Sequence, residues 1–157
     1  MWLDSRLTFG VHIQKKRQQV LTRYKRMWWL LRPRSGMTLS NKVLLYKTIL
    51  RPLWSYGSQL WGCAARTNVA RIQSAQSTIL RGITGTFWDN YVTNGILHRE
   101  LGVPTVSEVI VQLSLSYAKR LRMHPSDQAF RLLDAYGDTE RRLKRIKPFD
   151  CIADHLD

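Results

Sequence analysis

The sequence has no aspartate or glutamate between Asp4 and Asp89, although the same stretch carries fifteen lysine and arginine residues. The rest of the chain holds ten basic and eleven acidic residues, so the formal net charge of +14 lies in the first half. Metal-dependent phosphoryl transfer needs clustered carboxylates that hold the cations. The basic half of this chain therefore cannot form a two-metal active site.

Cysteine is also scarce, and long apolar runs are missing. Cys63 and Cys151 lie far apart with no metal-ligand residues beside them, so we expect reduced thiols rather than a zinc site or a disulfide framework. The four histidines are scattered, and no glycine-rich phosphate loop occurs, so we expect no metal, cofactor or catalytic residue. The N-terminus does not resemble a signal peptide, and no apolar run is long enough for a membrane span. We expect a nuclear or cytoplasmic protein without membrane contact.

The unbalanced positive charge predicts a partner. A cationic surface without interspersed acids repels itself in a compact fold, and the phosphates of a polyanion are the usual compensation. Nucleic acid is therefore the expected partner, and the alternative is a solvated basic face that only keeps the protein soluble. The candidate phosphate-binding residues lie on the first predicted helix and in the loop after it: Lys15, Lys16, Arg17, Arg23, Lys25, Arg26, Arg32 and Arg34. Backbone contacts of this kind give affinity without sequence specificity.

Helical periodicity dominates the chain, and strand alternation is nowhere sustained. Apolar residues recur at steps of three and four over 13–31, which predicts a helix that Pro33 ends. A second helix is predicted to begin near Thr38 or Ser40, and Pro52 should end or kink it.

The aromatic segment 53–61 follows, and it can continue as a kinked helix whose rings pack inside, namely Trp54, Tyr56 and Trp61. A third helix is predicted over 68–81, closed by Gly82 and Gly85. These three helices make up the basic half of the chain.

Aromatic residues interleaved with bases raise a second possibility, since exposed rings can stack on unpaired nucleobases. Helical spacing places Tyr24 and Trp28 in the core, whereas Trp29 lies off the apolar stripe and is the better candidate for exposure. We therefore expect most of these rings to be core residues.

The second half begins its clearest helix at a capping box, in which Glu108 follows Thr105 by three residues. That helix should end at His124-Pro125, and two short helices are predicted after it, over 126–136 and 138–147. The basic run 141–147 could contact phosphates, act as a nuclear import signal or simply be solvated beside its neighbouring acids. The sequence thus predicts an all-α fold, with a basic three-helix bundle over 1–86 and a C-terminal helical segment over 87–157.

Several motifs also resemble a known family. The segment 45–62, which reads LYKTILRPLWSYGSQLWG, resembles the region behind the polymerase core of jockey-type non-LTR retrotransposon reverse transcriptases. Further segments are similar to that family in the same order along the chain: 3–13, 73–81, 96–106, 120–125 and 141–145. The resemblance covers nearly the whole chain.

This resemblance implies a thumb, a helical unit that grips the template–primer duplex, followed by a C-terminal helical segment. The catalytic aspartates of the family lie in a palm motif that ends in Asp-Asp, and no Asp-Asp pair occurs in this sequence. We therefore expect a polymerase fragment without catalytic activity, which binds RNA or DNA template–primer without sequence preference and can contact a palm domain. The alternatives are a non-functional remnant built to pack on the palm and a host-adapted RNA-binding protein.

Overall fold

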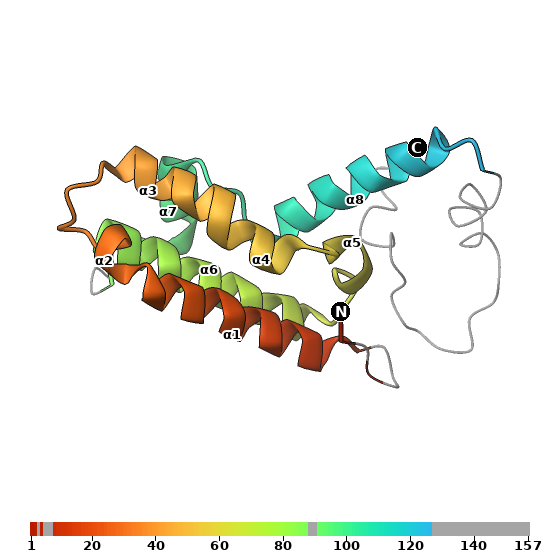
Figure 1. The fold of residues 1–157 in the computed structure, drawn as a ribbon, viewed down its shortest axis with the longest axis horizontal. Helices are drawn as coiled ribbons and strands as arrows, with labels where there is room; N and C mark the ends of the chain where they lie inside the picture. The colour runs from red at the N-terminus through yellow and green to blue at the C-terminus, as the bar shows by residue number, and fades with distance from the viewer. Residues whose placement is uncertain (3, 5–7, 88–90, 127–157) are drawn as a thin grey trace.

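The computed structural model describes residues 1, 2, 4, 8–87 and 91–126. Across these ranges the chain forms helices and no strands, which confirms the predicted all-α fold (Figure 1). The predicted helices over 126–136 and 138–147, and the basic run 141–147, lie outside the described residues.

The first predicted helix is present as α1 (Gly10–Arg26) and α2 (Trp28–Leu31), with a turn at Met27 between them. Leu31 is buried, and the backbone becomes extended at Arg32 with a ψ of 152°. Pro33 explains this stop, because its ring disfavours helical geometry in the residue before it.

The second helix begins where its cap was predicted. The Thr38 hydroxyl accepts a hydrogen bond from the Asn41 backbone N–H at 3.4 Å, and α3 (Leu39–Leu45) follows. The chain then continues through a π-helical turn, η1 (Tyr46–Leu50), into α4 (Arg51–Ser55), so Pro52 does not end the helix. Proline lacks an N–H and its ring crowds the preceding turn. The wider π turn directly before Pro52 relieves that conflict.

A left-handed turn at Gly57, with a φ of 70°, separates α4 from the short helix α5 (Ser58–Trp61). Trp54 and Trp61 are buried as predicted. Tyr56 was expected inside and is 76% exposed, so that prediction was wrong. The cause is the turn itself, because Tyr56 has already left helical geometry with a ψ of 124°.

The long helix α6 (Arg66–Thr84) ends at Gly85, which takes the left-handed conformation that favours glycine. Gly82 does not close the helix as predicted but lies inside it and is buried. Its role is a close approach to α1, since a Cβ atom at Gly82 would lie 1.8 Å from the Tyr24 hydroxyl oxygen.

Two further helices follow, α7 (Asn94–Leu101) and α8 (Val106–Arg122). The capping box is confirmed: the Thr105 hydroxyl accepts from the Glu108 N–H at 3.3 Å, and the Glu108 carboxylate accepts from the Thr105 N–H at 2.7 Å. The helix ends at Arg122, two residues before the predicted His124-Pro125.

Helices α1, α6 and the α3–α4 rod lie side by side, and α8 extends away from the end of the molecule near α5 (Figure 1). One hydrophobic cluster joins Ile13, Trp54 and Ile79 with Leu97 and Val106. The division of the chain at residue 87 and the comparison with a thumb remain predictions.

Two glutamines of α6 hold the turn that leads into α8. The Gln73 amide oxygen accepts from the Val106 N–H at 2.8 Å, and Gln76 donates to the Pro104 carbonyl at 2.8 Å. Gln73 also lies 2.9 Å from His98 Nε2, while His98 Nδ1 lies 2.8 Å from the Val103 carbonyl. The carbonyl can only accept, so Nδ1 carries the proton and Nε2 accepts from Gln73. The family-like segments 73–81 and 96–106 are therefore joined by direct hydrogen bonds.

Candidate nucleic-acid interface

The basic residues of α1 fall on different sides of the helix. Residues three, four, seven or eleven apart lie close together on a helix surface. Arg23 follows Lys16 by seven residues, and Arg26 follows Arg23 by three and Lys15 by eleven. We call this set the α1 stripe: Lys15, Lys16, Arg23 and Arg26. Lys16 is half-buried and the other three are exposed. The stripe spans roughly 16 Å at 1.5 Å per residue.

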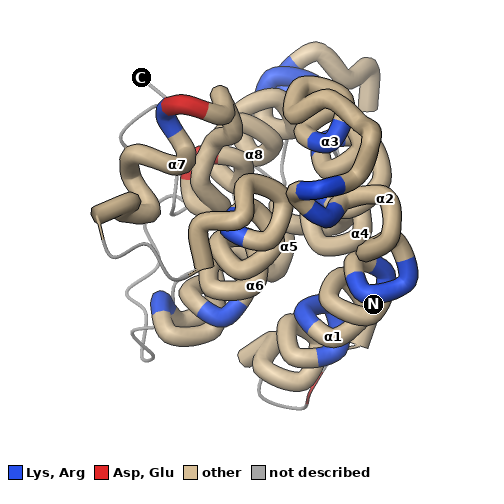
Figure 2. Tube along the Cα trace, turned by 90° about the vertical axis from the view of Figure 1, so that its left-hand side faces the viewer, with Lys and Arg blue, Asp and Glu red and all other residues tan. Residues whose placement is uncertain are grey.

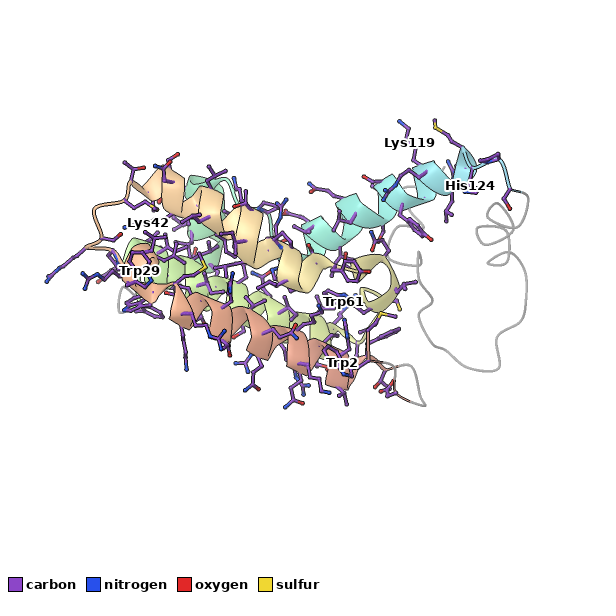
Figure 3. The ribbon with its side chains drawn as sticks, viewed as in Figure 1. Trp2, Trp29, Lys42, Trp61, Lys119 and His124 are labelled. Atoms are coloured by element: carbon purple, nitrogen blue, oxygen red, sulfur yellow. The ribbon has the colours of Figure 1, made fainter. Side chains whose placement is uncertain are left out.

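The remaining α1 bases are exposed but lie on other sides of the helix. Arg17 borders the buried row of Ile13, Val20 and Tyr24, and Lys25 lies on the solvent side of α1, about 80° around the helix from Lys15. Figure 3 shows nitrogen-tipped side chains along the side of α1 that points away from α6. The structure thus separates the predicted α1 residues into a stripe of four and two outliers.

Arg32 and Arg34 are exposed in the loop after α2. That loop is held by Lys42 of α3, whose ammonium group is buried and donates to the Arg32 carbonyl at 2.8 Å and the Pro33 carbonyl at 3.1 Å. Sequence analysis did not single out Lys42, which has no functional pattern around it. Its role is to position the two loop arginines rather than to meet a ligand.

Carboxylates of the described residues do not neutralise the stripe. There are three of them, Asp4, Glu100 and Glu108. Asp4 accepts from the backbone N–H and the hydroxyl of Thr8, which holds its pKa below the usual range, and Glu108 caps α8. Other bases lie on α6, α7 and α8, so the positive charge extends over several faces (Figure 2).

Two aromatic rings lie beside the first half of the stripe. The Lys15 ammonium nitrogen is 4.5 Å from the centroid of the Trp2 ring, and that of Lys16 is 5.9 Å from the centroid of Tyr56. Sequence analysis missed both contacts, because Trp2 precedes the helical pattern and Tyr56 lies in another segment of the fold.

At the other end of α1, Trp29 is 70% exposed as predicted, but Trp28 is 41% exposed rather than core. The turn at Met27 shifts Trp28 out of the α1 register, and it packs edge-on against Tyr24 with ring centroids 5.7 Å apart.

His12 is the buried titratable group beneath the first half of the stripe. Its Nδ1 accepts the Trp2 backbone N–H at 3.3 Å, and its ring packs between Trp2 and Trp61. Burial lowers the pKa of His12, and the charge of Lys16 adds to the effect. The imidazole therefore acts as a neutral packing group here.

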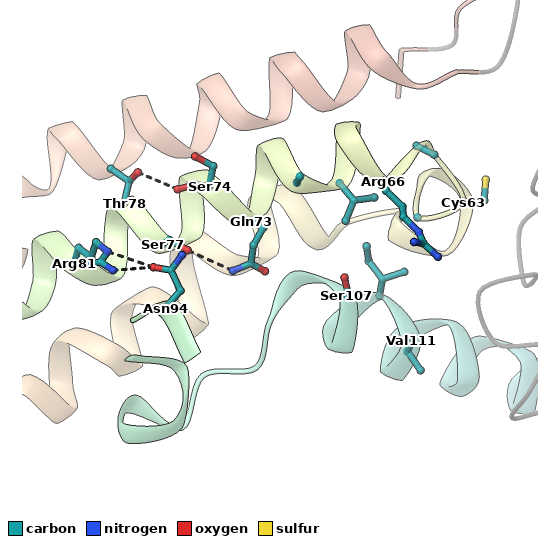
Figure 4. A pocket seen from close by; sticks show the side chains of 15 residues that line it. Cys63, Arg66, Gln73, Ser74, Ser77, Thr78, Arg81, Asn94, Ser107 and Val111 are labelled. Carbon is teal, nitrogen blue, oxygen red and sulfur yellow. Dashed lines mark hydrogen bonds between the residues drawn. The ribbon is translucent and has the colours of Figure 1, made fainter. Parts of the chain in front are cut away.

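A groove of about 1090 Å³ runs between α6 and α8, and Figure 4 shows its lining. Its polar groups bind one another: the Thr78 hydroxyl donates to the Ser74 carbonyl, and Arg81 donates to Asn94 Oδ1 and the Val92 carbonyl. Arg81 therefore anchors the segment before α7.

In the part of the chain that the structure describes, no three His, Cys, Asp or Glu side chains gather as metal ligands. None of the helices in those ranges has the length and apolarity needed to cross a membrane.

Comparison with known proteins finds relatives among transposon polymerases. The chain is 41% identical over 152 residues to the probable RNA-directed DNA polymerase from transposon X-element of Drosophila melanogaster, covering 96% of this chain and 16% of that protein. It is 41% identical over 145 residues to the probable RNA-directed DNA polymerase from transposon BS of the same species, covering 92% of this chain and 15% of that protein. The chain is also 36% identical over 155 residues to the RNA-directed DNA polymerase from mobile element jockey of Drosophila melanogaster, covering 94% of this chain and 17% of that protein.

No protein-family model and no solved structure matches the chain. The chain spans about one sixth of the length of the curated relatives it matches. Over nearly its whole length, it is therefore homologous to one segment of the RNA-directed DNA polymerases of jockey-type non-LTR retrotransposons.

Proposed function

We propose that this chain binds nucleic acid through phosphate contacts of the α1 stripe, assisted by Arg32 and Arg34, without sequence preference and without catalysis. The observation that carries the proposal is a row of four cations on one side of a helix, with no described carboxylate engaged to neutralise it. Phosphates would supply the missing negative charge.

The dimensions fit a nucleic-acid strand. A stripe of roughly 16 Å corresponds to about five nucleotides at 3.4 Å per nucleotide along one strand. The stripe borders the side of α1 that is buried against the core, so its charges are held on a rigid support. The related proteins are named RNA-directed DNA polymerases, which makes a template–primer duplex the natural ligand to test.

Salt dependence of binding tests this proposal. Each phosphate contact contributes about 0.9 to the slope of log affinity against log salt. A variant with all four stripe residues changed to Ala should lose a slope of about 3 to 4 in fluorescence anisotropy titrations with an RNA–DNA duplex. The control removes the same charge from α7 and α8, by changing Arg99, Lys119, Arg120 and Arg122 to Ala.

The control variant should retain most of the slope if α1 is the contact surface. Equal losses in the two variants would show that only the net charge matters, and the stripe would then not be a site. The experiment also separates the proposal from simple solubility, because a solvated basic face predicts weak binding by every variant.

A second candidate function is packing against another part of a polymerase, such as the palm. It is favoured by Leu39 and Leu44, which are 47% and 57% exposed on α3 and line a groove of about 450 Å³ with Leu101. Exposed apolar patches of this kind promote association. Changing Leu39 and Leu44 to Gln should reduce self-association in sedimentation velocity and leave the salt slope of nucleic-acid binding intact.

A further inference from the structure

Two exposed aromatic rings lie at the N-terminal end of the α1 stripe. Tyr56 is 76% exposed and Trp2 is 41% exposed. Each ring has a lysine ammonium group over one face: Lys16 lies 5.9 Å from the centroid of Tyr56, and Lys15 lies 4.5 Å from that of Trp2. Rings and cations from three segments of the chain therefore meet in one patch, which we call the aromatic end of the stripe: Trp2, Lys15, Lys16 and Tyr56.

The Trp2 ring and the backbone of Tyr56 are anchored to the buried core. The Trp2 backbone N–H donates to His12 Nδ1, and the Trp2 ring lies 5.8 Å from the His12 ring, which in turn lies 6.4 Å from Trp61. The Tyr56 carbonyl accepts from the Trp61 indole N–H at 3.2 Å. Figure 3 shows Trp2 beside the start of α1, near Trp61. The two rings are thus presented to solvent from supports that share one buried tryptophan.

We propose that the aromatic end of the stripe binds unpaired nucleotides: Lys15 and Lys16 turn from the ring faces to the adjoining phosphates, and the bases stack on Tyr56 and Trp2 in their place. This inference rests on the proposed function, in which the rest of the stripe contacts the backbone. Bases within a duplex are covered by their neighbours, so only unpaired bases can place a face against a protein ring. Aromatic platforms interleaved with cations bind single strands in this way.

The position of the patch suggests how it works with the rest of the stripe. The aromatic rings occur at Lys15 and Lys16, whereas Arg23 and Arg26 lie two to three turns further along α1. Trp28 and Trp29 are also exposed beyond the other end of α1, so the feature that marks the aromatic end is the pairing of each ring with a lysine ammonium group. A strand that follows α1 would meet both rings and cations there, which fits a segment of unpaired nucleotides next to a duplex.

The test compares two oligonucleotide duplexes that differ only in a short single-stranded overhang. One overhang carries bases and the other carries abasic residues, so both have the same phosphates. The full chain should bind the base-containing overhang at least about fivefold more tightly, because stacking on an aromatic ring contributes this much per base.

The Trp2→Leu, Tyr56→Leu double variant should bind both duplexes equally and keep the wild-type salt slope. Tyr56→Phe, which retains the ring, should keep most of the preference and serves as the conservative variant. Trp29→Leu removes an exposed ring from the other end of α1 and should also keep the preference.

The outcomes distinguish this inference from the proposed function. Equal binding of the two overhangs by the wild type, with a steep salt slope, would overturn the stacking site and leave the phosphate contacts in place. A preference that persists in the double variant would overturn the assignment to Trp2 and Tyr56. Binding without salt dependence would overturn both proposals.

Discussion

The contact between Gly82 and Tyr24 is the sharpest packing test of this fold. A Cβ atom at Gly82 would lie 1.8 Å from the Tyr24 hydroxyl oxygen, 3.0 Å from Tyr24 Cζ and 3.2 Å from Phe87 Cε2. The distance to the Tyr24 hydroxyl oxygen is much shorter than a van der Waals contact. A Gly82→Ala substitution therefore has to displace the Tyr24 ring or move α1 away from α6.

The expected cost follows from two opposing effects. Overpacking a core costs about 1–3 kcal/mol, and replacing glycine by alanine within a helix recovers about 1 kcal/mol. Gly82→Ala should therefore lower the free energy of unfolding by up to about 2 kcal/mol. The Tyr24 hydroxyl is buried without a hydrogen-bond partner among the described residues, and burial raises its pKa to about 12. Tyr24→Phe should consequently cost little.

Removing the hydroxyl removes the 1.8 Å contact and leaves the close approaches of Tyr24 Cζ and Phe87 Cε2. In the Tyr24→Phe background we therefore expect Gly82→Ala to cost less than in the wild type, with a coupling of about 1–2 kcal/mol between the two sites. Urea unfolding followed by circular dichroism at 222 nm measures this for the four proteins of the cycle, provided that the m value stays constant. Gly36→Ala is the control, because nothing lies within 4 Å of a Cβ atom there. Additive effects of Gly82→Ala and Tyr24→Phe would refute the predicted contact between α1 and α6.

Three further predictions concern buried polar groups. The folded state lowers the pKa of His12, so the unfolded chain binds more protons below about pH 6.5, and the free energy of unfolding should fall as the pH falls from 7 towards 5. His12→Leu should flatten this dependence in urea titrations repeated across that pH range, and an unchanged pH profile would contradict the assignment. Lys42→Met removes two hydrogen bonds from a charged donor to loop carbonyls, and we expect a loss of about 1–3 kcal/mol by the same unfolding assay. Gln73→Leu leaves His98 Nε2 and the Val106 N–H without their partner and should cost about 2–4 kcal/mol, whereas the exposed Gln112→Leu should cost little.

The helix starts at Thr38 and Thr105 were predictable because each depends on local hydrogen bonds, whereas α1 and α6 have no side-chain cap and begin at Gly10 and Arg66 rather than at the predicted 13 and 68. Thr38 and Thr105 each accept from a backbone N–H three residues ahead, so the pattern of a few neighbouring residues was sufficient. The uneven charge and the family motifs were equally visible, since they need only the order of residues.

The exposure of individual side chains was less predictable, because it depends on turns and on packing partners. Helical spacing placed Trp28 inside, and a continued kinked helix placed Tyr56 inside, yet turns at Met27 and Gly57 carry both rings to the surface. The same spacing could not show that Gly82 meets Tyr24, since the two lie on different helices.

The sequence by itself determined the all-α class, the capped helix starts at Thr38 and Thr105, the acid-free basic half and the relationship to transposon polymerases. Only the tertiary structure decided which four bases of α1 form a stripe, that Lys42 is buried beneath the loop arginines, and that Trp2 and Tyr56 lie beside Lys15 and Lys16. The physical reason is that local hydrogen bonds and charge counts depend on neighbours in the chain. A binding surface depends on contacts between segments that only packing of the core brings together.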